Sequence, residues 1–166
     1  MSCIAIATAL AAIAAANLRG GQDSIRLRSA LVELQSQDHL MRDRARRWGD
    51  RGELVFSAET GRVMRVEPRR EGQPHEIPLA EFADDVRVEK VLVAGDRETD
   101  RDTTRIACST AGRTKTYAAL VAAGSERQWI VVTGLTGKFE RIDDERRVAD
   151  IFRMLGTSPA DGDDAR

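Results

Sequence analysis

The pattern of hydrophobic and polar positions sets the N-terminal end of the chain apart from the rest. Residues 1–18 (MSCIAIATALAAIAAANL) carry no charge, and charged residues begin at Arg19. This run lies at the short edge of the length that a helix needs to cross a membrane, about 20 residues. We therefore expect an apolar membrane helix, with a cleaved secretory signal and a buried helix of a soluble domain as the alternatives. Its large apolar side chains are Ile4, Ile6, Leu10, Ile13 and Leu18.

A second helical pattern follows the apolar run. Gly20-Gly21 predicts a loosened or bent helix, and Asp23 or Ser24 can cap the run that continues to Gly49. Spacings of four and three alternate between the apolar residues of this run, with Asp38 in the one vacant position. This spacing predicts an amphipathic helix of about seven turns that packs its stripe on the segments downstream. The stripe consists of Leu27, Leu31, Leu34, Met41, Ala45 and Trp48.

Beyond Gly49 the pattern changes to that of β-strands. Residues 53–57 and 62–66 flank a turn that ends at Gly61, which predicts a hairpin with this glycine at positive φ. Residues 75–78 predict an edge strand, because Pro78 has no N–H to donate to a ladder. Further strands are expected at 86–93, with a bulge at Glu89-Lys90, and at 104–108, 114–122, 128–133 and 138–142.

A short helix closes the pattern, and the whole predicts an α+β fold. Asp143 is placed to cap this helix, and Gly156 to end it. We expect a long N-terminal helix packed on one antiparallel sheet of six or so strands, with no internal repeat. The expected segments are an apolar helix at 1–18, its amphipathic continuation at 19–49, a β-rich globular domain at 50–156 and a disordered polar tail at 157–166.

The charge of the chain limits its partners. The net charge is −1 and the isoelectric point is near 6.2, so no global attraction to nucleic acid is expected. The end of the long helix nevertheless carries a run of arginines that forms a candidate DNA-binding patch. The neighbouring Asp43, Asp50 and Glu53 favour a solvated, ion-paired face instead. The patch comprises Arg42, Arg44, Arg46 and Arg47.

The sequence favours no catalytic or metal-binding pattern. The two histidines, His39 and His75, lie on a predicted helix and in a predicted loop, with no nucleophile and carboxylate in a recognisable arrangement. Cys3 and Cys108 have no metal-ligand partner at useful spacing. The alternating acids from Asp96 to Asp102 resemble part of a calcium loop but lack its turn glycine, which favours an exposed loop. We therefore expect no catalytic residue, cofactor, metal or small-molecule substrate.

Several short motifs recur in an order that resembles a known family. The segment DRARRWG (43–49) leads from the long helix into the first strand. The segment STAGRT (109–114) contains Gly112 in a turn, and IVVTGLTGKF (130–139) contains Thr136 and Gly137 between two strands. In this order the motifs resemble the minor pseudopilin H group of type II secretion systems and the related FimT-like type IV pilins. The similarity covers most of residues 1–142.

The resemblance implies a structural subunit rather than an enzyme. It would be anchored in the bacterial inner membrane by one helix, with its globular domain in the periplasm, and would assemble with other pilins or pseudopilins. Small residues such as Ala7 and Ala11 would let the helices approach closely. The alternatives are a DNA-binding minor pilin of a DNA-uptake system and an exported soluble domain with a cleaved signal.

The sequence departs from this family at its N-terminus. No basic leader, Gly-Phe cleavage site or following Glu precedes the long helix. The basic residues Arg19, Arg26 and Arg28 follow the apolar run, and by the positive-inside rule alone they would hold the domain in the cytoplasm. One hypothesis accounts for both departures: Met1 lies inside the apolar segment of a longer natural chain.

Overall fold

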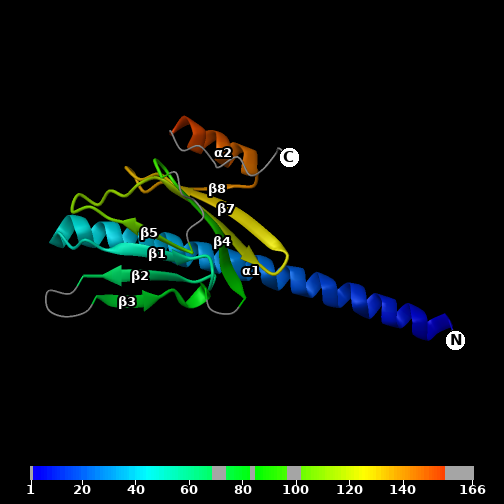
Figure 1. The fold of residues 1–166 in the computed structure, drawn as a ribbon. Helices are drawn as coiled ribbons and strands as arrows, with labels where there is room; N and C mark the ends of the chain where they lie inside the picture. The colour runs from blue at the N-terminus through cyan, green and yellow to red at the C-terminus, as the bar shows by residue number, and fades with distance from the viewer. Residues whose placement is uncertain (1, 69–73, 83–84, 97–101, 156–166) are drawn as a thin grey trace.

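The computed structural model describes residues 2–68, 74–82, 85–96 and 102–155, with side chains from Gly21 onward within these ranges. The expected tail at 157–166 lies outside the described residues, as do parts of the loops around residues 70 and 99. The described residues form one long helix, two small antiparallel sheets and a short C-terminal helix (Figure 1). The predicted α+β class is therefore confirmed.

Helix α1 is continuous from Ser2–Trp48, and Figure 1 shows its N-terminal end extending beyond the sheets. The helix runs through Gly20-Gly21 without interruption, so neither Asp23 nor Ser24 caps a second helical run as the sequence suggested. A glycine costs a helix about 1 kcal/mol relative to alanine, which good helix formers on both sides outweigh. The predicted end is confirmed: Gly49 has φ 71, and its N–H donates to the carbonyl oxygen of Ala45 at 2.9 Å.

The strands form two four-stranded sheets, not the single sheet that the sequence predicts. The first sheet has the order β3-β2-β1-β5 and the second has the order β4-β6-β7-β8. All pairings are antiparallel. The strands are β1 (Glu53–Ser57), β2 (Val63–Glu67), β3 (His75–Pro78), β4 (Val86–Val93), β5 (Thr103–Ala107), β6 (Tyr117–Ala123), β7 (Glu126–Val132) and β8 (Phe139–Ile142).

Several local predictions about the strands are confirmed. β1 and β2 form the expected hairpin, with Gly61 at φ 69. Pro78 ends β3, which lies at a sheet edge. The register of β4 against β6 shifts between Val88 and Lys90, where the bulge was expected. The start of β6 differs from the prediction, because the N–H of Thr114 bonds to Gly134 in a turn and the strand begins only at Tyr117.

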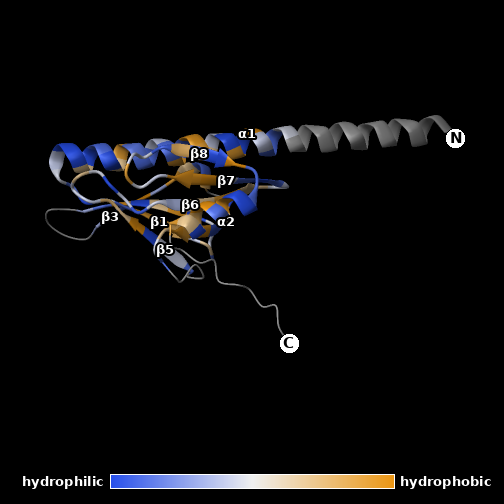
Figure 2. Cartoon of the chain, turned by 90° about the horizontal axis from the view of Figure 1, so that it is seen from above, coloured by the Kyte–Doolittle hydropathy of each residue, from blue (hydrophilic) through white to orange (hydrophobic). Residues whose placement is uncertain are grey.

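The second sheet lies between the two helices. α1 packs on β6, β7 and the short 3₁₀ helix η1 (Ala80–Phe82), and Figure 2 shows it lying along the sheets with hydrophobic and hydrophilic residues interspersed along its described part. On the far face, helix α2 (Glu145–Met154) buries Val148 and Phe152 against Trp129. The main core also includes Leu54 and Phe56 of the first sheet, so α1 joins both sheets.

The cap of α2 differs by one residue from the prediction. Asp144, not Asp143, is the N-cap, and its carboxylate accepts a hydrogen bond from the N–H of Arg146 at 2.9 Å. The Asp143 carboxylate instead accepts a hydrogen bond from Gln128 at 2.9 Å. Because Asp143 bonds to Gln128 of β7, Asp144 is the residue that accepts from the free N–H groups at the start of α2.

Candidate functional site

The inner face of α1 carries the stripe that the sequence indicated. Five of its residues are buried against the sheets, as is Ala30 between them, whereas Trp48 is 62% exposed. The expectation that Trp48 completes the packing stripe is therefore wrong. Its ring lies 5.6 Å from the guanidinium carbon of Arg44, which is a cation–π contact on the surface. The buried five are Leu27, Leu31, Leu34, Met41 and Ala45.

The vacant position of the stripe holds a buried ion pair. Asp38 is 1% exposed and Arg42 is 2% exposed, and Arg42 Nε donates to Asp38 Oδ2 at 2.6 Å. The hydroxyl of Tyr117 donates to the other carboxylate oxygen at 3.2 Å. Both charges are thus paired and hydrogen-bonded, which a buried charge requires. The sequence pattern placed an acid here but did not indicate its partner.

Arg42 also connects α1 to two distant turns. Its Nη1 donates to the carbonyl oxygen of Gly134 at 2.7 Å, and its Nη2 donates to Thr114 Oγ1 at 2.7 Å. A longer contact, 3.4 Å, joins Nη1 to the carbonyl oxygen of Gly112. One side chain therefore holds the two segments that carry the family-like motifs, 109–114 and 133–137.

Both turns approach α1 closely, and each has a glycine with positive φ at the point of contact. Gly112 has φ 70, and a Cβ placed there would lie 2.9 Å from the carbonyl oxygen of Arg42. Gly137 has φ 72, and its Cβ would lie 3.2 Å from the side chain of Arg42. Thr136 directly precedes Gly137, and its hydroxyl accepts a hydrogen bond from the N–H of Lys138 at 3.2 Å. The motif residues thus serve the packing of the helix on the sheet.

The arginines at the end of α1 do not form the candidate DNA-binding patch and are mostly ion-paired, as the neighbouring acids indicated. Arg42 is buried, which removes it from any surface. Arg44 donates to Glu67 Oε1 at 2.7 Å, and Arg47 donates to Asp43 Oδ1 at 3.0 Å. Among the described residues, only Arg46 of the four is exposed without an ion-pair partner. The structure therefore separates the four arginines instead of gathering them.

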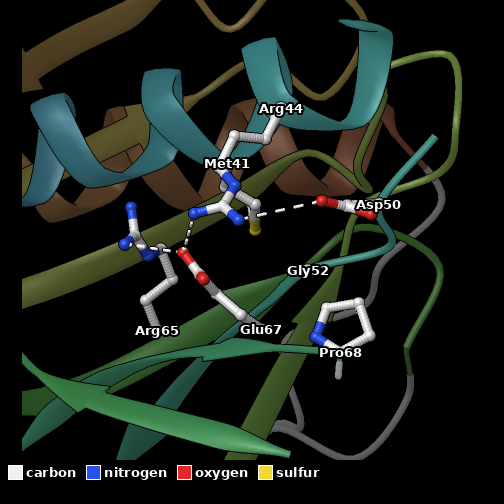
Figure 3. Close-up of a pocket in the computed structure, with 7 residues that line it drawn as sticks. All are labelled: Met41, Arg44, Asp50, Gly52, Arg65, Glu67 and Pro68. Atoms are coloured by element: carbon white, nitrogen blue, oxygen red, sulfur yellow. Dashed lines mark hydrogen bonds and ion pairs between the residues drawn. The ribbon is translucent and has the colours of Figure 1, made fainter. Parts of the chain in front are cut away.

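A small cavity lies between the end of α1 and strand β2 (Figure 3). Its volume is about 10 Å³, which is room for about one water molecule. Glu67 Oε1 lies 2.7 Å from both Arg44 Nη1 and Arg65 Nη2. Burial lowers the pKa of Arg65 more than the nearby Glu67 raises it. A cavity of this size is too small for an organic ligand, so we assign it no binding role.

The described residues offer few groups for chemistry. Cys108 is 2% exposed, and burial raises the pKa of its thiol. Both histidines are exposed: His39 on α1 and His75 in β3, where the sequence indicated a loop or an edge strand. Within the described ranges, no three residues of the His, Cys, Asp and Glu types come together as metal ligands. The calcium-like run from Asp96 to Asp102 lies mostly outside the described residues.

The outer face of α1 exposes a line of apolar side chains. Ile25, Val32 and Leu40 are 70%, 54% and 42% exposed. Their spacing of seven and eight residues is about two helical turns, so they lie on one side of the helix. The exposed Ser29 and Ser36 lie between them. This line faces away from the stripe that packs on the sheets.

The apolar N-terminal segment belongs to α1, but its side chains are outside the described part. This applies to Ile4, Ile6, Leu10, Ile13 and Leu18. Among the residues whose side chains are described, no helix offers a stretch both long and apolar enough to cross a membrane.

Comparison with known proteins gives a likeness of fold. No protein-family model and no curated protein matches the sequence. Two solved structures of the minor pseudopilin EpsH from the type II secretion system of Vibrio cholerae are similar, with TM-scores of 0.54 and 0.50. In both cases the identity is 7%, and the match covers 70% of this chain and 95% of the other.

The chain therefore has a pilin-like fold, with a long N-terminal helix packed on antiparallel sheets. Its structural neighbours are minor pseudopilins. The likeness covers most of the chain, and the order of the elements is the one that the sequence motifs indicated. At this identity the comparison establishes the fold alone.

Proposed function

We propose that this chain is a structural subunit of a pseudopilus or type IV pilus. Its apolar N-terminal helix anchors it in the bacterial inner membrane, with the globular domain in the periplasm. It assembles with other pilins or pseudopilins by packing of α1. No small-molecule substrate and no cofactor take part in this role.

The outer face of α1 is the observation that carries the proposal. A helix that only completed a globular core would bury one stripe and expose polar residues elsewhere. Here the side opposite the buried stripe carries Ile25, Val32 and Leu40 in the open, with small serines between them. Small residues beside apolar ones let the backbone of another helix approach closely.

The buried pair Asp38–Arg42 supports the same role. A subunit of a filament needs its helix fixed to its own domain while neighbouring subunits contact that helix. The ion pair and its hydrogen bonds to the 109–114 and 133–137 segments hold α1 in one register on the sheet. In some proteins a buried polar group fixes the register of a helix against its neighbour, and we assign that role to this pair.

Substitution on the outer face tests the assembly role. Ile25→Glu combined with Val32→Glu puts two charges on the outer line and leaves the core intact. The double variant is produced in the native host with its sister subunits, and filaments sheared from the cells are probed for it by immunoelectron microscopy. We expect loss of incorporation with an unchanged circular dichroism spectrum.

The matched control is Met154→Glu, a charge placed on an 82% exposed apolar residue of α2. This variant should enter filaments as the wild type does. Normal incorporation of the Ile25/Val32 double variant would refute a role for the outer face of α1.

Fractionation of native cells tests the anchor. The mature protein is recovered from membrane and soluble fractions, and its N-terminal residue is determined by mass spectrometry. A membrane-bound form that begins upstream of Met1 with a methylated Phe supports the pilin pathway. A soluble form that begins near Asn17 would mean an exported domain with a cleaved signal, and the filament proposal would fall.

A further inference from the structure

Strand β5 leaves one side of its backbone open. It ends the first sheet, where β1 is its one strand partner among the described residues. Two bonds flank the β1–β5 ladder: Ala58 N–H donates to Asp102 O, and Cys108 N–H donates to Gly52 O, both at 2.9 Å. They show which residues of the two strands bond to each other. Bonded and non-bonded pairs alternate in an antiparallel ladder. Thr104 and Ile106 therefore face β1 with their N–H and C=O groups.

The other three residues of β5 point their backbone groups away from β1. These are Thr103, Arg105 and Ala107, spaced two residues apart as a strand ladder requires. Among the described residues, none of their N–H or C=O groups has a backbone partner on the open side. The edge carries no proline, and the charge of Arg105 is paired with Glu53 at 3.1 Å. The usual devices that block an edge strand are therefore weak here.

A groove begins where β5 ends. It has a volume of about 550 Å³, and its lining includes Ala107, Cys108, Arg51, Arg113 and Lys115. Its lining atoms are mainly apolar, and no acidic residue is among the lining residues. The groove shares Ala107 with the open edge, so an extended chain that pairs with β5 would reach the groove at the end of the strand.

The rim of the groove is positively charged. Among the described residues, Arg51 and Arg113 have no ion-pair partner, and Lys115 has only Asp96 at 3.7 Å. Arg46 of α1 lies over the turn beside the groove, because a Cβ on Gly112 would meet its side chain. By contrast, Arg44, Arg47 and Arg105 are each paired with an acid.

We propose that β5 and this groove bind an extended acidic segment of a partner protein. The segment adds a strand to the open edge, and its backbone bonds to Thr103, Arg105 and Ala107. Its carboxylates contact Arg51 and Arg113, and its apolar side chains lie on the groove floor. Strand addition combined with side-chain pockets is a recurring mode of peptide recognition.

The open edge favours a peptide over nucleic acid as the occupant. A DNA backbone offers phosphates to the arginines but no alternating N–H and C=O groups to β5. The net charge of the chain, −1, also gives no general attraction to DNA. Duplex DNA is therefore the competing ligand in the test. This inference does not depend on the assembly role, because it concerns a different surface from α1.

The probe is a fluorescent synthetic peptide of alternating Val and Glu, about six residues long to match a typical strand. Binding to the purified full chain in a mild detergent is followed by fluorescence anisotropy at low salt. The controls are a Val–Lys peptide of the same length, and the Val–Glu peptide with N-methyl groups on alternate amides. A labelled DNA duplex is measured in parallel. We expect binding of the unmodified Val–Glu peptide alone.

Charge reversal tests the rim of the groove. Arg51→Glu with Arg113→Glu should lower the affinity for the Val–Glu peptide about tenfold, because two favourable contacts become repulsive. Arg141→Glu with Arg146→Glu is the matched control, since both are exposed arginines without an ion-pair partner in the described part. This control should bind like the wild type. Equal weakening in the two double variants would mean general electrostatic attraction and would overturn the proposal.

Amide hydrogen exchange tests the edge. The peptide should slow exchange at Thr103, Arg105 and Ala107, and leave Thr104 and Ile106 unchanged. Unchanged exchange at the three outward amides would refute strand addition. So would DNA that binds more tightly than the peptide and loses this binding in the Arg51/Arg113 variant. The first result would exclude β5 as a binding element, and the second would mean that the groove binds phosphate groups.

Discussion

Arg42 Nη1 lies 2.7 Å from the carbonyl oxygen of Gly134, a residue 92 positions later in the chain. The same guanidinium bonds to Thr114 and to Asp38. Arg42 therefore satisfies groups from the helix and from both turns. Its removal would leave several buried acceptors without a donor at once.

Arg42→Ala is expected to destabilise the protein strongly. The substitution leaves the Asp38 carboxylate buried and unpaired, and breaking a buried pair in this way costs about 3–5 kcal/mol. The measurement is urea unfolding of the full chain, followed by circular dichroism. Arg46→Ala, the next exposed arginine on α1, is the control and should change the free energy of unfolding by no more than about 0.5 kcal/mol.

Replacing both partners separates pairing from burial. Asp38→Leu with Arg42→Met removes both charges and fills similar volume, and such replacements are often close to neutral. The double variant should therefore be more stable than Arg42→Ala alone. If Arg42→Ala costs less than about 1 kcal/mol, the pair does not hold α1 to the two turns.

Gly112→Ala is expected to destabilise more than a glycine substitution elsewhere with similar φ. At Gly112, φ is 70 and the new methyl group would meet the carbonyl oxygen of Arg42 at 2.9 Å. At Gly49, φ is 71 but nothing lies within 4 Å of the added Cβ. In both variants an alanine at positive φ destabilises the fold by about 1 kcal/mol, and only in Gly112→Ala does the steric clash add to this loss. Equal losses in thermal unfolding would mean that the turn shifts without cost.

Sequence periodicity was enough to predict α1, most strands and the buried stripe from Leu27 to Ala45. It could not predict which strands share a sheet, because β1 pairs with β5 across about fifty residues and no local pattern encodes that choice. The single-sheet expectation failed for this reason. The likeness to pseudopilins was indicated by the order of short turns rather than by any one motif.

The buried ion pair shows the limit of sequence reasoning most clearly. Asp38–Arg42 and Asp43–Arg47 have the same spacing of four residues on the same helix. The first pair is 1% and 2% exposed, and the second is 47% and 66% exposed. The sequence distinguishes the two pairs only by position, because Asp38 occupies the vacant position of the apolar stripe and Asp43 lies outside the stripe. The contacts to Thr114 and Gly134 had no signal at all.

Leu34 and Trp48 occupy equivalent places in the sequence pattern and should respond differently to truncation. Leu34 is 0% exposed, so Leu34→Ala is expected to cost about 2–5 kcal/mol through lost burial and a cavity. Trp48 is 62% exposed, so Trp48→Ala should change stability by about 0.5 kcal/mol or less despite its size. Urea unfolding of both variants measures the difference. A large loss in Trp48→Ala would place the indole against the sheet after all.

Tyr117 is expected to make stability fall at alkaline pH. Burial, and then the charge of Asp38, raise the pKa of its hydroxyl well above the ordinary value of about 10. Above pH 10 the unfolded chain therefore loses this proton while the folded chain keeps it. The unfolded state then binds fewer protons, so stability decreases with rising pH, by up to about 1.4 kcal/mol per pH unit.

Tyr117→Phe tests the origin of this alkaline decrease. The variant loses the hydrogen bond to Asp38, about 1 kcal/mol at neutral pH, but its stability should decline less steeply above pH 10. The chain has one tyrosine, so the ultraviolet absorbance of tyrosinate reports this group directly. In the folded wild type the absorbance should rise only as the protein unfolds. Titration near pH 10 in the folded state would show that the hydroxyl reaches solvent, and the buried network around Asp38 would then be open.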